Sequence, residues 1–553
     1  MADGNYDKID VLIAGGGPAG LCCAIQLKVL SPQTEVCVIE KGAELGNHNL
    51  SGAVLEKEPL HTLLNAASPG WQDTDAAKDI LANKIDRDNI LLLLGKKFGL
   101  DIHFSIILAK LLGLGFGQLN HTGDYSVSIS KLTKWLGQIA KQLGVEILCG
   151  FAASDIIADS QGAKAVKLVD QGLNKESHKQ PNYVEGETIE ANYIVLAEGC
   201  DGLLTEKFIK KAGLVRKVNQ LFSVGVKELI KVSPEQYAKF TGGRVIHAMG
   251  YPLWTPFFGP NMFGGGIAYA QQNEHIAVGM IVGADWKYYD FNPQDALVLF
   301  KKHSKIKKFI EGGTVVEAGA KMIPEGGWYA VPRDPQTGWI GKGNCVIIGD
   351  SAGFVNMLKI KGLHNAIDSG MMAAKAIIES QQTPSDVAVK YTNMLLKSNV
   401  AKEMKTAAKF RQVVAKFGPL QGMPLSVFGT LLPLFNVEKD FEEMAVAKYR
   451  HKPNQNFDKD TFTAVAATHH REEQPSHLSI LDQNICQTKC TPKFLRPCIT
   501  FCPAGVYETV MGEVKPANPS NCLHCKTCQR KCPFDNIRWT CPEGTGGPRY
   551  KRM

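Results

Sequence analysis

Eight cysteines between residues 486 and 532 form a two-part array whose spacing suits iron–sulfur clusters. The second part reads C-x-x-C-x-x-C-x-x-x-C over Cys522, Cys525, Cys528 and Cys532, with a proline directly after it. This pattern is typical of bacterial ferredoxins, because its two-residue gaps let three thiolates converge on one cubane cluster while the fourth reaches a neighbouring cluster. Cys502 is also followed by proline and supplies the matching fourth ligand. The sequence therefore predicts one 4Fe–4S cluster, a carrier of single electrons, on Cys502, Cys522, Cys525 and Cys528.

The first part of the array is spaced more loosely. Cys486, Cys490 and Cys498 are separated by three and then seven residues, and with Cys532 they complete a second set of four. We interpret this set as the ligands of a second cluster, with an empty or purely structural set as the alternative. A zinc site or a disulfide framework is the alternative for the tight run, although zinc ribbons space their cysteine pairs much farther apart.

A glycine-rich segment near the N-terminus predicts a dinucleotide site. Residues 11–14 read as a buried strand, Gly15, Gly17 and Gly20 form G-x-G-x-x-G, and a helical run follows. In this context the glycines allow a tight turn, the approach of a pyrophosphate and close helix packing, and the start of the helix holds the phosphate charge. Glu40 ends the next apolar run, where a carboxylate accepts hydrogen bonds from the adenosine ribose.

Two later segments favour FAD over NAD. Residues 194–202 read as a strand entering a turn, like the segment that closes over the dinucleotide in proteins of the FAD monooxygenase type. Residues 345–353 read as a strand that ends in Gly-Asp before a helix; Asp350 would hold the ribityl chain of the flavin, and Gly353 belongs to the same cofactor-binding segment. An ordinary helix N-cap is the alternative for Asp350. No second G-x-G-x-x-G stands in a strand–helix context, so the electrons are expected from a donor other than NAD(P)H.

A third candidate site lies between the flavin segments. Gly264, Gly265 and Gly266 read as a turn, and a glycine turn beside aromatic rings would admit a flat ring against bare backbone. The flanking aromatic residues are Phe257, Phe258, Phe263 and Tyr269. A hairpin turn over a core is the alternative.

Two apolar segments are candidates for contact with a membrane. Residues 104–119 carry a single charge, on Lys110, with apolar residues at helical spacing, and residues 417–435 are interrupted by three prolines and preceded by basic residues. Neither reaches the roughly 20 apolar residues that a spanning helix needs. Because repeated glycine and proline suit a core helix poorly, we interpret both segments as shallow anchors in one leaflet, with core helices as the alternative.

The elements that position these residues need more than one domain. At 553 residues the chain is too long for a single core, and its content of 44% hydrophobic and 21% charged residues is that of a globular protein. The polar first ten residues hold no signal sequence and the other cysteines show no framework spacing, so neither export nor disulfides are expected. A net charge of +8 suits an acidic protein partner or an anionic membrane face, or serves solubility alone. Nucleic acid is not an expected partner.

Over nearly its whole length the chain resembles the electron transfer flavoprotein-ubiquinone oxidoreductase family. The similar segments are residues 36–56, 196–200 and 349–377, together with the highly specific CPAGVYE at 502–508, NCLHCKTC at 521–528 and NIRWTCPEGTGGPRY at 536–550. The resemblance implies a monotopic enzyme of the inner membrane with FAD, a 4Fe–4S cluster and a quinone site. It places the glycine pair that contacts quinone at Gly264 and Gly265. It also places the cluster ligands at Cys502, Cys522, Cys525 and Cys528, in agreement with the set predicted from spacing.

The chain departs from the family in three places. The family has aspartate at the position of Cys532 and lacks counterparts of the three cysteines that precede Cys502, so a second cluster would be a ferredoxin-like addition. Residues 254–262 are longer than the family's equivalent. Residues 75–120 match the family poorly, so the first membrane segment rests on composition alone.

The predicted fold is α/β: an FAD-binding Rossmann-like domain of the glutathione-reductase type, an interleaved α+β quinone domain and a C-terminal ferredoxin-like iron–sulfur module. Residues 451–474, polar and proline-bearing, are expected to link the last two. The predicted division is an FAD domain of residues 1–75, 125–225 and 331–400, a quinone or membrane segment 76–124, a quinone-binding domain 226–330, a helical membrane-surface segment 401–450 and an iron–sulfur domain 451–553.

The expected function is transfer of electrons from reduced electron transfer flavoprotein, through FAD and the clusters, to ubiquinone or menaquinone. The expected location is the cytoplasmic face of the inner membrane. A ferredoxin-fed flavin prenyl (geranylgeranyl) reductase is the alternative enzyme, because such proteins share the first FAD segments and an apolar pocket. A soluble electron carrier with storage clusters is the non-catalytic alternative. No catalytic acid or base is assigned.

Overall fold

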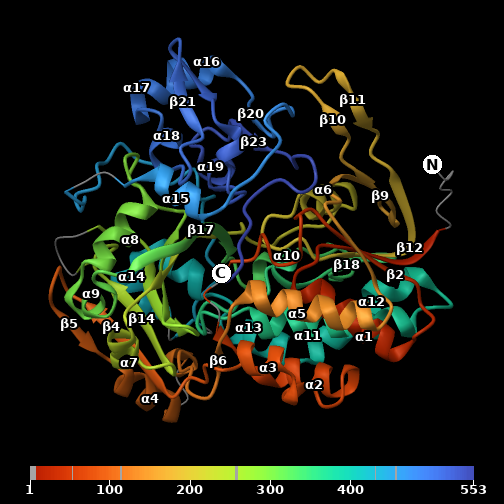
Figure 1. Cartoon of the computed structure of the whole chain (residues 1–553), viewed down its shortest axis with the longest axis horizontal. Coiled ribbons are helices and arrows are strands. Elements are labelled where there is room, and N and C mark those ends of the chain that lie inside the picture. The colour runs from red at the N-terminus through yellow and green to blue at the C-terminus, as the bar shows by residue number, and fades with distance from the viewer. Residues whose placement is uncertain are drawn as a thin grey trace.

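The computed structural model describes residues 8–50, 52, 54–112, 115–255, 260–426, 428–429, 431–454 and 457–553. Two large sheets lie beside each other, the first to the right and the second to the left in Figure 1. The C-terminal domain, in blue, lies above the second sheet (Figure 1). The predicted α/β class is confirmed by these sheets and the helices that cover them.

The first sheet is built around β1 (Ile9–Ala14), whose residues Val11, Leu12 and Ile13 are wholly buried. The strand order is β18-β19-β12-β1-β2-β7, with β9 paired to β12 and β8 to β9. Strands β1, β2, β7, β12 and β19 pair in parallel, and burial on both faces explains why residues 11–14 of β1 are all apolar. The bounds are β2 Val36–Glu40, β7 Glu146–Cys149, β8 Ala153–Asp159, β9 Gly162–Leu168, β12 Thr188–Leu196, β18 Gly341–Lys342 and β19 Cys345–Ile347.

Helices α1 (Pro18–Leu30) and α11 (Leu363–Glu379) pack against each other beside this sheet. Their approach is close, because a Cβ added at Gly370 of α11 would lie 2.3 Å from the carbonyl oxygen of Ala19. Helix α5 (Ile129–Gln142) also packs on α1. The start of α1 is therefore held firmly at the end of β1, where the dinucleotide site is predicted.

The second sheet has seven strands in the order β17-β13-β16-β15-β14-β4-β5. Strands β4 and β5 come from a segment more than 100 residues before the others, and β4 pairs in parallel with β14. The bounds are β4 Arg87–Leu93, β5 Gly99–Asp101, β13 Phe222–Lys231, β14 Arg244–Gly250, β15 Gly264–Gln271, β16 His275–Gly283 and β17 Thr314–Pro324.

The glycine triplet is not a turn, as the sequence predicted, but the first three residues of β15. The reason is that the sheet leaves no space for a side chain at these positions. A Cβ at Gly264 would lie 2.1 Å from the carbonyl oxygen of Ile281, and one at Gly265 would lie 2.3 Å from that of Ala248. The glycines therefore bring three strands close together. Of the flanking aromatic residues, Phe257 and Phe258 lie outside the described residues.

The C-terminal domain packs its core onto the second sheet. Residues 451–474, which the sequence predicted to link the quinone-binding and iron–sulfur parts, include α15 (Lys459–Val465), which buries Phe462 in that core. Arg471 also pairs with Glu543 at 2.7 Å. The remaining elements are β20 Leu478–Ile480, α16 Gln483–Ile485, η5 Cys486–Cys490, α17 Thr491–Phe494, α18 Pro497–Phe501, β21 Tyr507–Val510, β22 Glu513–Pro516, α19 Thr527–Lys531 and β23 Ile537–Trp539.

The last nine residues return from this domain to the first sheet. The N–H of Thr545 donates to the carbonyl of Lys41 at 2.9 Å, and the N–H of Tyr550 donates to the carbonyl of Asn47 at 3.0 Å. Both acceptors follow β2, which borders the predicted dinucleotide site. These backbone bonds fix the C-terminal domain against that site.

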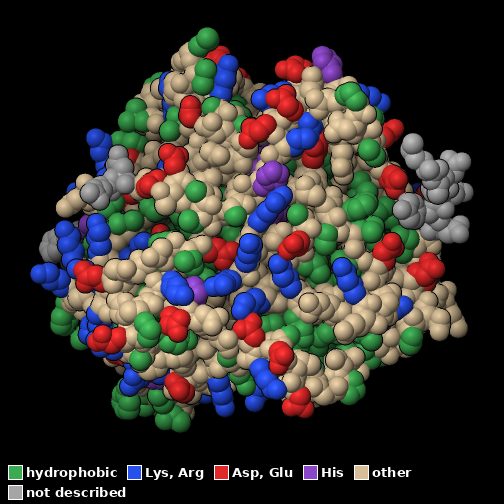
Figure 2. All heavy atoms as spheres, viewed as in Figure 1, with side chains coloured by type: hydrophobic (Ala, Val, Ile, Leu, Met, Phe, Trp, Pro, Cys, Tyr) green, Lys and Arg blue, Asp and Glu red, His purple; other side chains and the backbone are tan. Residues whose placement is uncertain are grey.

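The two apolar segments expose much of their apolar surface. In the first, α4 (His103–Leu111) leaves Phe104 77% and Leu111 79% exposed, and Figure 2 shows hydrophobic side chains at the lower left, where Figure 1 places α4. In the second, α14 (Phe410–Ser426) is broken at Gly418 (φ 74°), and Leu431 beyond it is 82% exposed. Val427 and Thr430 lie outside the described residues. Within the described part of the chain, no helix has the length and apolar character to cross a membrane.

Candidate cofactor sites

A cavity of about 260 Å³ opens at the carboxyl ends of β1, β2 and β12 and is lined by all three predicted FAD segments. Gly15 has φ 115°, and a Cβ there would lie 2.3 Å from the carbonyl oxygen of Ala197. A Cβ at Gly20 would lie 2.1 Å from the carbonyl oxygen of Gly15. At Gly17, by contrast, the nearest atom is Nδ2 of Asn49 at 3.8 Å, so this glycine faces open space. The first and third glycines thus shape the turn, and the second leaves room for a ligand.

Glu40 is fixed at the edge of this cavity. Its Oε2 accepts from the N–H of Gly16 at 3.0 Å, and its Oε1 accepts from the N–H of Gly42 at 2.8 Å. The carboxylate is therefore held in place beside the glycine turn. The remaining lone pairs of its oxygens can accept hydroxyl groups, as a ribose contact requires.

Asp350 also lines this cavity. It lies inside α10 (Gly349–Ala352), whose N-cap is Ile348, so the alternative of an ordinary N-cap does not apply. Burial raises the pKa of Asp350 to about 6, against the opposing effect of Lys321. Gly353 ends α10 with φ 85°, and it is not among the described residues that line the cavity.

Four lysines bring positive charge to the cavity. Lys41, Lys321, Lys361 and Lys526 all line it. Among the described residues no carboxylate lies within 4 Å of the amino groups of Lys41, Lys321 or Lys526. Burial, with the neighbouring Lys41 and Lys526, lowers the pKa of Lys321 to about 8. A phosphate group bound here would compensate this unpaired positive charge.

The first set of cysteines is buried beside this cavity, and hydrogen bonds reach its sulfur atoms. The N–H of Val506 donates to Sγ of Cys502 at 3.4 Å, and the hydroxyl of Thr527 donates to Sγ of Cys525 at 3.3 Å. Donors directed at cysteine sulfur stabilise the thiolate form and tune the potential of a bound cluster. Trp539, which follows the set, lines the dinucleotide cavity.

The second set of cysteines comes together as well. Cys486, Cys490, Cys498 and Cys532 are buried and line one small cavity. Asn536 reaches two of them: its N–H donates to Sγ of Cys532 at 3.3 Å, and its Nδ2 donates to Sγ of Cys486 at 3.4 Å.

An internal repeat relates the two sets. Helix α18 carries Cys498 and is followed by Cys502, and α19 carries Cys528 and is followed by Cys532, so each repeat contributes one cysteine to each set. The N–H of the second cysteine donates to the carbonyl of the first, at 3.2 and 3.1 Å. The residue before each helix has a left-handed backbone, with φ of 59° and 60°. The looser sequence spacing of the second set therefore does not disturb the local geometry around α18.

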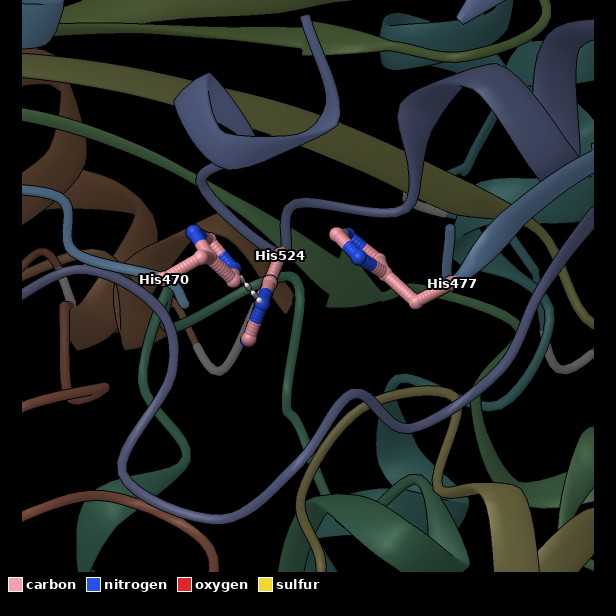
Figure 3. Close-up of side chains that lie close together, drawn as sticks. All are labelled: His470, His477 and His524. Carbon is pink, nitrogen blue, oxygen red and sulfur yellow. Dashed lines mark hydrogen bonds between the residues drawn. The ribbon is translucent and has the colours of Figure 1, made fainter. Parts of the chain in front are cut away.

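Three buried histidines support the loop that carries the first cysteine set (Figure 3). His470 donates from Nδ1 to the carbonyl of Ser520 at 2.7 Å, so its Nε2 accepts from Nε2 of His524 at 2.9 Å. The ring of His477 stacks in parallel with that of His470 at 5.2 Å between centroids. Burial lowers the pKa of His470 to about 4 and that of His477 to about 3, so both rings are neutral at pH 7. Nitrogen atoms of the three rings lie within 4.8 Å of one another, and one hydrogen bond links His470 and His524.

A second, apolar cavity of about 90 Å³ lies beside the dinucleotide cavity. Gly264 and Gly265 line it, as do Phe263, Leu119 from the first apolar segment and Met423 from the second. Its walls are almost wholly apolar, which suits a hydrophobic ring better than a charged ligand. Three residues line both cavities, namely Ile281, Met357 and Ile360.

Sequence reasoning missed several residues at these sites. His524 and Lys526 lie inside the C-x-x-C-x-x-C run, and that position was a usable signal. The buried group of Asp88, His121 and His247 beside the apolar cavity gave no local signal, because it comes from three distant segments.

Three family profiles match parts of the chain. Residues 10–55 match an FAD binding domain, residues 222–323 match "ETF-QO, ubiquinone-binding", and residues 454–551 match "Electron transfer flavoprotein-ubiquinone oxidoreductase, 4Fe-4S". With the geometry above, these matches define the class of protein: an oxidoreductase that contains FAD and a 4Fe–4S cluster.

Relatives that align over nearly the whole chain identify the family. The chain is 36% identical to the mitochondrial electron transfer flavoprotein-ubiquinone oxidoreductase of Arabidopsis thaliana, over 99% of this chain and 84% of the relative. It is 33% identical to the Pseudomonas aeruginosa protein of that name, over 99% of this chain and 100% of the relative. The chain belongs to the electron transfer flavoprotein-ubiquinone oxidoreductase family, and the predicted resemblance is confirmed.

Solved structures support the fold alone. A geranylgeranyl bacteriochlorophyll reductase-like protein of Thermoplasma acidophilum has a TM-score of 0.51 and 18% identity, over 76% of this chain and 96% of that one. A flavin-dependent brominase has a TM-score of 0.52 and 15% identity, over 77% of this chain and 90% of that one. The likeness to a reductase-like protein therefore reflects the shared flavin fold.

Proposed function

We propose that the protein accepts electrons from reduced electron transfer flavoprotein and delivers them, through FAD and iron–sulfur clusters, to ubiquinone or menaquinone in a membrane. The cofactors supply the redox chemistry, and the chain binds, orients and shields them. One observation carries the proposal: the three sites are contiguous. Lys526 and Trp539 of the iron–sulfur domain line the dinucleotide cavity, and Ile281, Met357 and Ile360 join that cavity to the apolar one.

In this proposal FAD lies along the larger cavity. Gly15, Gly17 and Gly20 receive its pyrophosphate at the start of α1, supported by the open space at Gly17 and by the dipole of the helix. Glu40 receives the ribose, and Asp350 receives the ribityl chain. Gly353 remains a predicted neighbour of the flavin through its place directly after α10.

The quinone ring lies in the apolar cavity, against the bare backbone of Gly264 and Gly265. Both glycines line that cavity, and neither can carry a side chain without meeting a neighbouring strand.

We also propose a second 4Fe–4S cluster on Cys486, Cys490, Cys498 and Cys532, beside the one on the first set. Support comes from the shared cavity of these four side chains, the hydrogen bonds that Asn536 donates to two of their sulfur atoms, and the repeat of α18 and α19. A cubane cluster needs four thiolates around one space, and both sets provide them.

Iron analysis of the anaerobically purified protein tests the second cluster. About eight irons per chain, with matching acid-labile sulfide, are expected from two sets of four thiolates. Cys490→Ser is expected to lower this to about four irons while FAD remains. Cys149→Ser, which changes a half-buried cysteine outside both sets, should leave the iron content unaltered. A reproducible four irons that Cys490→Ser does not change would refute the second cluster.

We propose that the protein binds the cytoplasmic face of the inner membrane without spanning it. The exposed apolar side chains of the two apolar segments support this, because side chains such as Phe104, Leu111 and Leu431 would be covered by one leaflet. Leu119 and Met423 continue both segments into the apolar cavity. A quinone could therefore enter from lipid without crossing water.

Donor-dependent turnover separates this function from its alternatives. With reduced electron transfer flavoprotein as the only reductant, we expect steady formation of quinol from a ubiquinone or menaquinone analogue. A prenyl reductase would instead saturate a prenyl chain with ferredoxin as donor, and a storage carrier would be reduced once without turnover. Either of those results, with no quinol formed, would reject the proposed function.

A further inference from the structure

One polar side chain stands out in the wall of the apolar cavity. His247 of β14 lines it and is buried. The sheet places a carboxylate beside it: Val245 pairs with Asp88 and His247 pairs with Ile90 in the parallel register of β14 and β4. Side chains two residues apart share a face, so Asp88 and His247 are diagonal neighbours on the same side of the sheet.

Asp88 is the centre of a histidine group. Its Oδ2 accepts from the N–H of His121 at 2.8 Å and faces Nδ1 of the same residue at 3.0 Å, and Nδ1 of His103 lies 4.0 Å from it. Its Oδ1 lies 3.9 Å from Nδ1 of His247. Although burial opposes ionisation, the hydrogen bond with His121 and the nearby imidazole of His247 hold the pKa of Asp88 well below its usual range. The group therefore contains one buried carboxylate anion.

Three atoms of this group lack hydrogen-bond partners among the described residues: Nδ1 of His103 and two atoms that face each other across the sheet. Oδ1 of Asp88 and Nδ1 of His247 are both buried, and neither has a hydrogen bond among the described residues. A small rotation of the imidazole closes the gap between them. Nδ1–H would then donate to Asp88, and the opposite nitrogen, Nε2, would be directed toward the cavity. A carboxylate that orients a histidine in this way also stabilises its protonated form.

We propose that His247 is the proton donor to the quinone, and that Asp88 is the residue that orients His247 and stabilises its protonated form. This inference rests on the proposed function. Quinone reduction needs protons as well as electrons, and His247 is the titratable side chain among the described residues that line the apolar cavity. The groups that face it are Asp88 from β4, His121 from the segment before β6 (Tyr125–Ser126) and, through Asp88, His103 from α4.

One turnover reduces one quinone to quinol. The quinone gains two electrons from the donor flavoprotein, and both of its carbonyl groups become hydroxyl groups. The protonated His247 gives the proton of Nε2 to the nearer carbonyl oxygen, and the second carbonyl takes its proton from water. His247 is then reprotonated from solvent by way of His103, which is 21% exposed at the end of the group.

His247→Gln tests the donor role, because glutamine can donate a hydrogen bond but does not titrate. We expect the kcat for reduction of a short-tailed ubiquinone analogue to fall by about 10²-fold or more. The affinity for the analogue should remain, as should reduction of FAD by the donor flavoprotein. Reduction of ferricenium, which takes an electron without a proton, should be unaffected. Bound flavin and iron report whether the variant folds.

The pH dependence separates proton donation from a structural role. Proton donation needs the protonated imidazole, so in the unaltered protein kcat should fall as pH rises. Asp88→Asn removes the anion that favours this form, so the fall should move to lower pH. His247→Gln should abolish the fall of kcat with rising pH. It should also reduce the solvent deuterium isotope effect on the remaining activity.

A matched control is His275→Gln, which changes a buried histidine of strand β16 in the same sheet that does not line either cavity. It should keep the kcat and the pH profile. The inference is overturned if His247→Gln retains the kcat and the pH profile of the unaltered protein, or if it weakens only the affinity for quinone. It is also overturned if the variant loses ferricenium reduction to the same degree as quinone reduction. An unaltered protein that reduces no quinone would reject the proposed function instead.

Discussion

Gly17→Val is expected to yield a folded protein that contains essentially no FAD. The backbone at Gly17 has φ −82° and ψ 178°, a conformation that valine adopts without strain. Its Cβ would enter open space, with the nearest atom 3.8 Å away, so the fold accommodates the side chain. That space is where the pyrophosphate must approach the backbone, and a branched side chain fills it.

Flavin released by denaturation, measured per polypeptide, gives the result directly. Gly95→Val provides a matched control, because a Cβ at Gly95 meets nothing within 4 Å and Gly95 does not line the cavity. It should retain full FAD. The iron content should be the same in both variants, since the cysteine sets lie in the other domain. Full FAD occupancy in Gly17→Val would show that the dinucleotide site has been misplaced.

A double variant with Leu111→Glu and Leu431→Glu is expected to lose binding to lipid vesicles and activity with a long-tailed quinone. Both side chains are about four-fifths exposed, at 79% and 82%, so the charges should not disturb folding. A charge held in lipid is unfavourable even near the interface, by up to about 2.5–3.5 kcal/mol at full depth. Activity with a short, water-soluble quinone and the FAD content should be retained.

Vesicle flotation and the ratio of long-tailed to short-tailed quinone activity measure this effect. Met511→Glu is the control, because Met511 is 97% exposed at the tip of β21 and β22, at the opposite end of the molecule from α4 (Figure 1). It should float with vesicles as the unaltered protein does. Unaltered flotation of the double variant would reject the membrane surface, and loss of its FAD would mean that these segments belong to the core.

Local patterns predicted the cofactor residues because each site depends on short spacing. Gly15, Gly17 and Gly20 form their turn from six residues of chain, and Cys522, Cys525 and Cys528 share one loop, so sequence neighbours become site neighbours. The resemblance to a known family then joined these local sites into one protein. Neither source required knowledge of how the two sheets pack.

Features that depend on long-range pairing could not be predicted in this way. The glycines at 264–266 read as a turn, yet they begin a central strand, because the carbonyl groups of neighbouring strands leave no room for a Cβ. Asp88 and His247 meet only through the parallel register of β4 and β14, across more than 150 residues of sequence. Lys41 and Lys321 reach one cavity from different sheets. In each case the sequence shows the residue but does not show which distant residue lies beside it.

Anaerobic titration of the holoprotein tests the central claim, that FAD, two clusters and a quinone site form one electron path. With reduced electron transfer flavoprotein as the only donor, the protein should take up about four electrons per chain, two on FAD and one on each cluster. Addition of quinone should then withdraw them all, with formation of quinol. Uptake of about three electrons would contradict the second cluster. A reduced protein that keeps its electrons in the presence of quinone would contradict the path itself.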